Sequence, residues 1–175
     1  MDVSFVPVVR EHSDAVKRFL LAEPWPFHVG AALTPEAIDE RIGAGWLDGP
    51  GRQTFWIVSA STRCGLLRLF DLGDGAPLFD LRVSGSARNR GIGAAAVRWL
   101  ASYVFDGWPD VNRIEATTRV DNVAMRRILE RCGWAKESHW REVWSSPEGD
   151  RDGVGYALLR RDHQRGSVTP VRWDE

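Results

Sequence analysis

The chain has 175 residues, 43% hydrophobic and 27% charged, which is the composition of one ordinary globular domain. Its 23 basic and 24 acidic residues give a formal net charge of −1, so overall charge favours neither nucleic acid nor an acidic membrane as a partner. The two cysteines lie far apart in the sequence and fit neither a disulfide framework nor a metal-ligand spacing. The chain shows no signal-peptide pattern and no apolar run near the roughly 20 residues that span a bilayer. We therefore expect a cytoplasmic protein without disulfides, bound metal or membrane spans.

The N-terminal half of the chain predicts two helices and four strands. Ala15, Val16, Phe19 and Leu20 fall on one face of a helix that begins at residue 12 or 13. Two prolines in the segment 23–28 break this helix, and a threonine–proline pair at 34–35 begins the second one. Runs of β-branched and apolar residues predict strands at residues 3–10, 54–59, 64–69 and 78–83.

The C-terminal half predicts two more helices and three more strands. A helix over residues 94–105 has an apolar stripe at 3-to-4 spacing, and a second helix is capped at Asp121 or Asn122 and ends at Gly133. Strands are expected at 113–118, 135–144 and 155–159, the last two as a hairpin around a polar loop at 145–153. We expect a single α/β domain over residues 1–175, with an irregular tail from about residue 163.

A glycine-bearing turn connects the strand at 78–83 to the following helix, and it has the features of an anion site. Helix N-termini carry unpaired N–H groups and a partial positive charge. Gly91 and Gly93 leave that backbone accessible, and Arg88 and Arg90 add charge. A Walker loop would need Gly-Lys-Ser/Thr where three alanines stand, and a dinucleotide fingerprint would open the fold instead of following four strands. The simpler alternative is a tight connection without a ligand.

Two motifs of the chain resemble those of the GNAT superfamily of N-acetyltransferases. Arg88-x-x-Gly91-x-Gly93 is similar to its Arg/Gln-x-x-Gly-x-Gly/Ala motif. Asp121-Asn122-x-Ala124 followed by Cys132-Gly133-Trp134 is similar to its second motif, an asparagine-led helix that ends in glycine and an aromatic residue. The C-terminal hairpin resembles that of the RimJ/RimL-like branch at Glu137, Gly149, Asp152, Tyr156 and Leu159.

The resemblance implies the acyl-CoA N-acyltransferase fold, in which helices flank a mixed, mostly antiparallel central sheet splayed between its fourth and fifth strands. It also implies acetyl-CoA as co-substrate, no metal, and acetyl transfer to a primary amine. The residues that it assigns to the co-substrate are Leu81, Arg82, Val83, Arg88, Asn89, Arg90, Gly91, Ile92, Gly93, Ala94 and Asn122.

Three residues are candidates for the general base that takes the proton of the amine: Asp80, Glu142 and His28. Asp80 lies on the strand next to the expected thioester, although Arg82 on the same face makes a salt bridge an equal alternative. Glu142 precedes by two residues the position where the RimL-like pattern has a base glutamate and this chain has Trp144. His28 lies in a loop of tryptophan, proline and phenylalanine, where a lone histidine is more often structural.

The sequence also leaves more than one candidate for the general acid that protonates the leaving thiolate. Met125 stands where the RimJ/RimL-like branch has serine, which leaves Cys132, Tyr156 or departure into solvent. A backbone N–H such as that of Val83 is expected to stabilise the oxyanion, whereas Glu115 is expected to pair with an arginine. We expect catalysis mainly by positioning, with a water relayed by a carboxylate as base.

Tryptophan is unusually common, with nine residues, most of which we expect to fill the core and its edges. In the family that the chain resembles, the early helices and the last hairpin wall the acceptor side. An aromatic wall there favours a small amine or an aminoacyl compound; a protein N-terminus and a CoA-binding module without turnover are the alternatives. Relatives are often dimers, so a homodimer is allowed, and no nucleic-acid or membrane partner is expected. The residues expected at the acceptor are Trp25, Phe27, His28, Trp46, Trp140 and Trp144.

Overall fold

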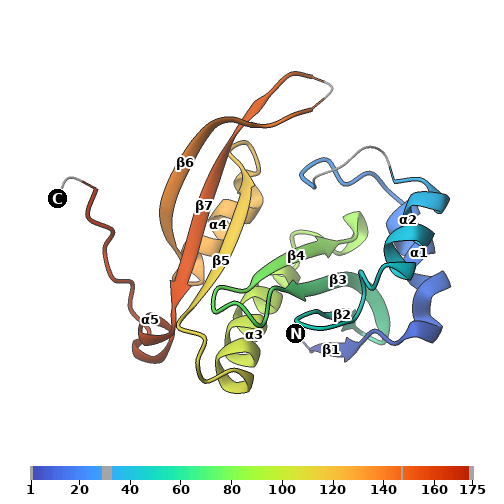
Figure 1. Cartoon of the computed structure of the whole chain (residues 1–175), viewed down its shortest axis with the longest axis horizontal. Coiled ribbons are helices and arrows are strands. Elements are labelled where there is room, and N and C mark those ends of the chain that lie inside the picture. The colour runs from blue at the N-terminus through green and yellow to red at the C-terminus, as the bar shows by residue number, and fades with distance from the viewer. Residues whose placement is uncertain (1, 29–32, 147, 174–175) are drawn as a thin grey trace.

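The computed structural model describes residues 2–28, 33–146 and 148–173 and arranges them as two antiparallel sheets with helices packed around them (Figure 1). The first sheet has the strand order β1-β2-β3-β4 and the second has the order β5-β7-β6. In chain order the elements are β1 (Val3–Pro7), the short 3-10 helix η1 (Arg10–His12), α1 (Ser13–Leu21), α2 (Pro35–Gly43), β2 (Gln53–Ser59), β3 (Thr62–Phe70), β4 (Leu78–Val83), η2 (Gly85–Ala87), α3 (Ile92–Gly107), β5 (Arg113–Arg119), α4 (Val123–Arg131), β6 (Ala135–Trp144), β7 (Arg151–Leu159) and α5 (Arg160–Arg165).

The helices and strands expected from the sequence are present, but the limits of several differ. α3 begins at Ile92, two residues earlier than expected, because Gly91 adopts a left-handed conformation with φ of 76° and starts the helix directly. The first strand ends at Pro7, and a short 3-10 helix follows it. The tail begins with α5, so the irregular part starts after Arg165 and not at 163.

The last strand is longer than expected, since β7 begins at Arg151 inside the stretch predicted to be a loop. Its glycines serve close packing and not a turn. A Cβ built on Gly155 would lie 2.7 Å from Cη2 of Trp140, and one built on Gly153 would lie 2.8 Å from Nε1 of Trp144. The tryptophans of β6 therefore lie over β7 where only glycine leaves room for them.

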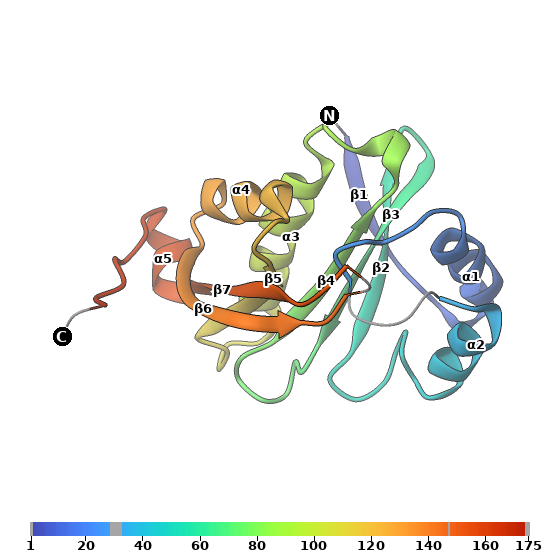
Figure 2. The same cartoon turned by 90° about the horizontal axis from the view of Figure 1, so that it is seen from above.

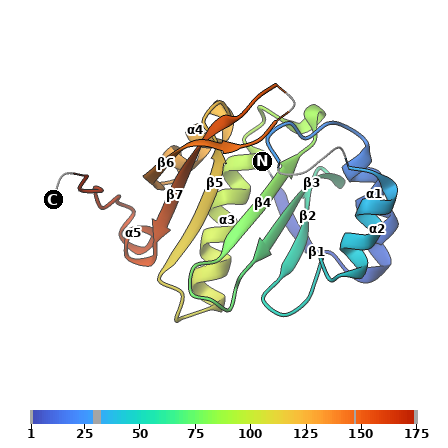
Figure 3. The same cartoon turned by 45° about the horizontal axis from the view of Figure 1, so that its top comes forward.

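The splay between the fourth and fifth strands is confirmed. β4 and β5 belong to different sheets, and the N–H of Glu115 donates to the carbonyl oxygen of Pro77 at 2.9 Å where the two strands come together. From that end the strands diverge, as Figure 3 shows. The two half-sheets therefore form a mixed, mostly antiparallel arrangement with an opening at its centre.

The helices cover both faces of the first sheet, with α1 and α2 on one side and α3 on the other (Figure 2). A large apolar cluster joins α3 to both sheets, and a smaller one joins α1 and α2 to the opposite face of β2 and β3. Alternation along the strands separates these two faces. Within the described part of the chain, no helix is both long and apolar enough to cross a bilayer.

Candidate active site

The face of the first sheet toward α1 and α2 carries the charged residues of β3 and β4. Arg68 lies directly opposite Asp80 in the antiparallel register, and Leu66 lies opposite Arg82. Side chains two residues apart on a strand share a face, and paired residues on neighbouring strands do so as well. Asp80, Arg82 and Arg68 therefore project on one side of the sheet, as the alternation of β4 predicted for the first two.

Asp80 is the centre of a polar cluster. Its carboxylate accepts hydrogen bonds from Nε and Nη2 of Arg82, at 3.2 and 3.0 Å, and its Oδ1 lies 3.2 Å from Nε2 of His28. Nε2 also lies 3.3 Å from the carbonyl oxygen of Leu81. Because both neighbours of Nε2 are acceptors, we assign the ring proton to Nε2.

The electrostatics of this cluster keep Asp80 ionised. Burial by itself would raise the pKa of Asp80, but the hydrogen bond from His28 and the charge of Arg82 outweigh it and hold that pKa well below its ordinary range. Arg82 is 5% exposed, and its Nη1 is buried without a hydrogen-bond partner among the described residues. Nδ1 of His28 is in the same condition. The cluster thus contains one donor and one potential proton acceptor that are not satisfied within the described part of the chain.

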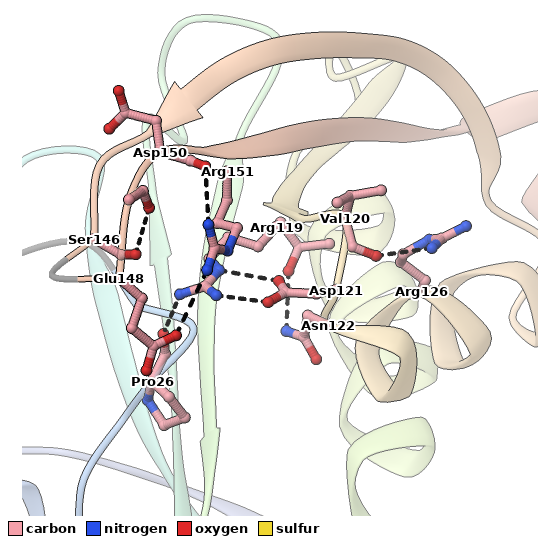
Figure 4. Close-up of polar contacts among 12 residues, drawn as sticks. Pro26, Arg119, Val120, Asp121, Asn122, Arg126, Ser146, Glu148, Asp150 and Arg151 are labelled. Carbon is pink, nitrogen blue, oxygen red and sulfur yellow. Dashed lines mark hydrogen bonds and ion pairs between the residues drawn. The ribbon is translucent and has the colours of Figure 1, made fainter.

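The segment that leads to His28 is attached to the rest of the protein at two points. Nε1 of Trp25 donates to the carbonyl oxygen of Leu20 at 2.9 Å, which holds the loop to the end of α1. Figure 4 shows Arg119 of β5 between this loop and the β5–α4 corner. Its Nη1 donates to the carbonyl oxygen of Pro26 at 3.0 Å, its other nitrogens bind Asp121, and its guanidinium lies 5.3 Å from the ring centre of Phe27.

These elements enclose a cavity of about 280 Å³ beside the opening between β4 and β5. It lies against the polar cluster of β4 and reaches to the tip of the β6–β7 hairpin. The residues that line it are Phe27, His28, Arg41, Trp46, Arg68, Phe70, Phe79, Asp80, Leu81, Arg82, Ala116, Thr117, Thr118, Asn122, Met125 and Trp144.

The structure brings together four of the six residues expected at the acceptor, namely Phe27, His28, Trp46 and Trp144, at the wall of this cavity. Trp25 lies behind the wall, with the Arg82 guanidinium 5.5 Å from its ring centre. Trp140 packs over Gly155 and does not line the cavity.

Glu142, one of the three base candidates, lies outside the cavity. It is exposed, has a φ of 53°, and donates its backbone N–H to Oδ1 of Asp152 at 3.0 Å. The acid candidates also lie elsewhere. The hydroxyl of Tyr156 donates to Oε1 of Glu130 at 2.9 Å, and burial raises its pKa; burial likewise raises the pKa of Cys132, which lies against the carbonyl oxygen of Ala94.

Sequence reasoning missed Arg41 and Arg68 as residues of the site. Arg68 interrupts an apolar strand between Leu67 and Leu69, both buried, and a charged residue on an otherwise buried strand is a usable signal. Arg41 gave no such signal, because it lies on a helix with many exposed charges. The expected pair of Glu115 with an arginine is present, as Arg113 Nη2 lies 2.8 Å from its Oε1.

The glycine-bearing turn becomes the first turn of α3. Gly91 is its N-cap, so the first N–H groups of the helix lack intrahelical partners. Arg90 is exposed and has no charged partner among the described residues, whereas Arg88 binds the Glu23 carboxylate at 2.9 Å and the carbonyl oxygen of Val83 at 3.0 Å. Gly93 lies against α4, since a Cβ there would be 2.9 Å from Cδ1 of Ile128.

Asn122, the second motif's asparagine, is occupied within the chain. Its side-chain oxygen caps α4 by accepting from the N–H of Met125, and its amide nitrogen donates to Thr118 Oγ1 at 3.0 Å. It lines the cavity beside these contacts. Its observed interactions are therefore those of a helix cap that joins α4 to β5.

The edge of β4 that faces the opening offers backbone groups. Ser84 donates its N–H to the carbonyl oxygen of Cys64 on β3, and backbone groups alternate along a strand. The peptide groups of Leu81 and Val83 therefore point away from β3 and into the opening. The contacts of their carbonyl oxygens with His28 and Arg88 agree with this direction.

A splayed α/β sheet, a helix N-terminus at the splay and a cavity beside it are the features of a protein that holds an extended anionic ligand against an acceptor pocket. The sequence model of one family, described as Acetyltransferase (GNAT) domain, matches residues 3–135. The chain belongs to this family of acetyltransferases, and it is an acyltransferase. No curated protein sequence matches the chain.

Solved structures agree with the fold. A chimera of the Vibrio cholerae spermidine N-acetyltransferase SpeG with hSSAT superimposes with a TM-score of 0.81 at 15% identity, over 94% of this chain and 99% of that one. RimL, the ribosomal L7/L12 α-N-protein acetyltransferase in complex with coenzyme A, superimposes with a TM-score of 0.78 at 16% identity, over 90% of this chain and 93% of that one. At these identities the likeness establishes the fold.

Proposed function

We propose that the chain transfers the acetyl group of acetyl-CoA to the primary amine of a small molecule or an aminoacyl compound. The observation that carries this proposal is the cavity of about 280 Å³ in which the His28–Asp80 pair lies beside the opening between β4 and β5. A cavity of this size is at the lower limit of small-ligand pockets. The solved complex of RimL with coenzyme A supports the choice of donor.

The residues at the opening fit the donor. The free N–H groups at the start of α3, with Arg90 beside them, suit a pyrophosphate, and Gly91 keeps that backbone accessible. The peptide groups of Leu81 and Val83 suit the amide-bearing arm of coenzyme A. Arg88 would act indirectly, because its contacts with Glu23 and Val83 fix the end of β4. Acetyl-CoA supplies a thioester, whose acyl carbon an amine can attack.

His28 is the residue that would take the proton of the amine. Asp80 is a weak base because its pKa is held so low, but it keeps the proton of His28 on Nε2. Nδ1 is then the acceptor nitrogen of the ring; it is buried in this structure, and a small movement of the ring would expose it to the cavity. The N–H of Val83 would stabilise the negative charge that develops on the thioester oxygen. Arg82 would hold Asp80 in place through its two hydrogen bonds.

The test is thiol release from acetyl-CoA over a panel of amino acids, aminoacyl nucleotides, polyamines, aminoglycosides and N-terminal peptides, with the acetylated product identified by mass spectrometry. We expect one class of small amine to be acetylated. His28→Ala should lower kcat/KM by about a hundredfold or more.

His12→Ala is the matched control, because His12 lies in η1 and does not line the cavity. Its kcat/KM should equal that of the unmodified protein. If only the N-terminal peptides are acetylated, the acceptor is a protein N-terminus and not a small amine. Binding of coenzyme A without turnover of any amine would contradict it.

A further inference from the structure

The cavity contains more positive charge than its one carboxylate can balance. Three arginines line it, from three elements: Arg41 of α2, Arg68 of β3 and Arg82 of β4. Asp80 is the only acidic residue among the described residues that line it. Because Asp80 binds Arg82 through both carboxylate oxygens, that pair is close to neutral.

Arg68 is held rigidly but lacks a counter-ion. Its Nε donates to the carbonyl oxygen of Trp46 at 2.9 Å, and its guanidinium lies 4.8 Å from the ring centre of Trp46 and 4.7 Å from that of Phe70. It forms no ion pair with a carboxylate in the described part of the chain. Burial lowers its pKa, an effect opposed by Asp80 and Asp71 and reinforced by Arg52 and Arg82. Its two terminal nitrogens make no hydrogen bond to any described residue.

Arg41 is the second cation without a counter-ion. It lies in the last turn of α2, half-buried, and its guanidinium makes no ion pair or hydrogen bond with any described residue. Both Arg41 and Arg82 also line a small apolar recess next to the cavity, which places the two side chains at the same wall. A half-buried guanidinium without an anion is costly, and an anionic ligand removes that cost.

We propose that the acceptor amine carries an anionic group, a carboxylate or a phosphate, which Arg41 and Arg68 bind while its amine faces His28. This inference rests on the proposed function and names the class of its substrate. Arg68 lies opposite Asp80 in the sheet, so the cation that would bind the anionic group lies next to the cluster that contains His28. Arginine binds carboxylate and phosphate through two parallel hydrogen bonds. Polyamines, which are cationic at both ends, are disfavoured by the same charges.

The test compares matched amines that differ only in the second group. Initial rates are measured with an ω-amino acid, the ω-aminoalkyl phosphate, the neutral amide and the diamine of the same chain length. We expect kcat/KM for the better of the two anionic amines to be at least tenfold higher than kcat/KM for the neutral amide. Its advantage over the diamine should be larger still. The ranking of carboxylate against phosphate identifies the anion. Equal or faster turnover of the diamine or the amide would overturn the inference and leave the acetyltransferase function standing.

Arg68→Gln and Arg41→Gln should each lower the ratio of anionic to neutral turnover about tenfold or more. Arg63→Gln is the matched control, because Arg63 also lies on β3 and stacks on a tryptophan, Trp56, but does not line the cavity. Its ratio should equal that of the unmodified protein. An unchanged ratio in both cavity variants would overturn the inference.

Inhibition of the unmodified protein gives a reading that does not depend on folding of the variants. Propionate should inhibit competitively against the amine and not against acetyl-CoA, while propionamide should not inhibit. Inhibition by both, or by neither, contradicts the anion site. If no amine is acetylated, the proposed function fails, and calorimetric titration of propionate and inorganic phosphate into the protein and its Arg41→Gln variant still decides whether these arginines bind an anion.

Discussion

Asp80 is held by Arg82 and His28, and this arrangement determines what it can do in the reaction. A carboxylate whose pKa is well below the ordinary range stays ionised at neutral pH and is a poor proton acceptor. It can still orient a histidine, as Nε2 of His28 is within 3.2 Å of its Oδ1. The sequence presented Asp80 and Arg82 as either a salt bridge or a catalytic pair, and the salt bridge is confirmed.

We predict that Asp80→Asn destabilises the protein by about 3 kcal/mol at pH 7, because Arg82 is buried and would lose its counter-ion. The folded-state pKa of Asp80 is lowered, so its contribution is fully present above the unfolded carboxyl pKa of about 3.9 and is lost as the pH falls below it. Urea unfolding should show that the difference in stability between the unmodified protein and Asp80→Asn is smaller near pH 3 than at pH 7. Asp106→Asn, at an exposed residue of α3, is the control. A difference that persists unchanged in acid would contradict an ionic origin.

Two motif residues of the turn, Arg88 and Gly93, make contacts within the protein that differ from the role expected for them. Arg88 and Gly93 were both assigned to the co-substrate by resemblance. In the structure, Arg88 is engaged by Glu23, and Gly93 allows close packing of α3 against Ile128 of α4. Arg90 makes no ion pair with any described residue, so it is the arginine of this turn that we propose binds the anionic part of the co-substrate.

At the scale of elements, the site depends on the close pairing of β3 with β4. Gly65 lies opposite Val83 in the register, and a Cβ on Gly65 would lie 2.5 Å from the carbonyl oxygen of Arg82. That atom belongs to the backbone, so it cannot turn aside as a flexible side chain would. The absence of a side chain at Gly65 thus determines where β4 places Asp80 and Arg82.

We predict that Gly65→Ala destabilises the protein by about 2 kcal/mol, through overpacking against β4, and lowers activity further by displacing the polar cluster. Gly73→Ala is the matched control, because a Cβ there would meet nothing within 4 Å. Denaturant unfolding and initial rates measure the two effects. Equal stability of both variants would contradict the prediction, because it would show that β4 can shift at little energetic cost to accommodate the added methyl group.

The elements themselves were largely predictable. Caps, prolines and apolar spacing are local signals, and they identified α1, α2, α3 and α4 within a few residues. The start of β7 was not predictable from the same signals, because Gly153 suggests a turn until Trp144 of β6 is seen to cover it. A contact between two strands overrides the local preference there.

At the scale of the whole molecule, the two half-sheets share one core. The larger apolar cluster includes Leu67 and Leu69 of the first sheet, Leu100 and Val104 of α3, and Ile114 of the second sheet. Although one backbone hydrogen bond links the strands near Pro77, α3 packs on both sheets. We therefore propose that residues 1–175 form a single folding unit.

We predict one cooperative unfolding transition, with calorimetric and van't Hoff enthalpies that agree. Leu100→Ala, at a fully buried position, should cost about 3 kcal/mol and shift near- and far-ultraviolet signals together. Leu21→Ala, at a residue that is 41% exposed, should change little. Two separated transitions would show that the half-sheets fold independently.

The sequence by itself determined most of the elements and the family, because each rests on residues close together along the chain. The tertiary structure alone decided which charged side chains meet. Arg41, Arg68 and His28 come from a helix, a strand and a loop, and they converge only through the pairing register of β3 with β4 and the packing of α2. A shift of one residue in that register would turn Arg68 to the opposite face, so no local pattern could have revealed the cationic side of the cavity.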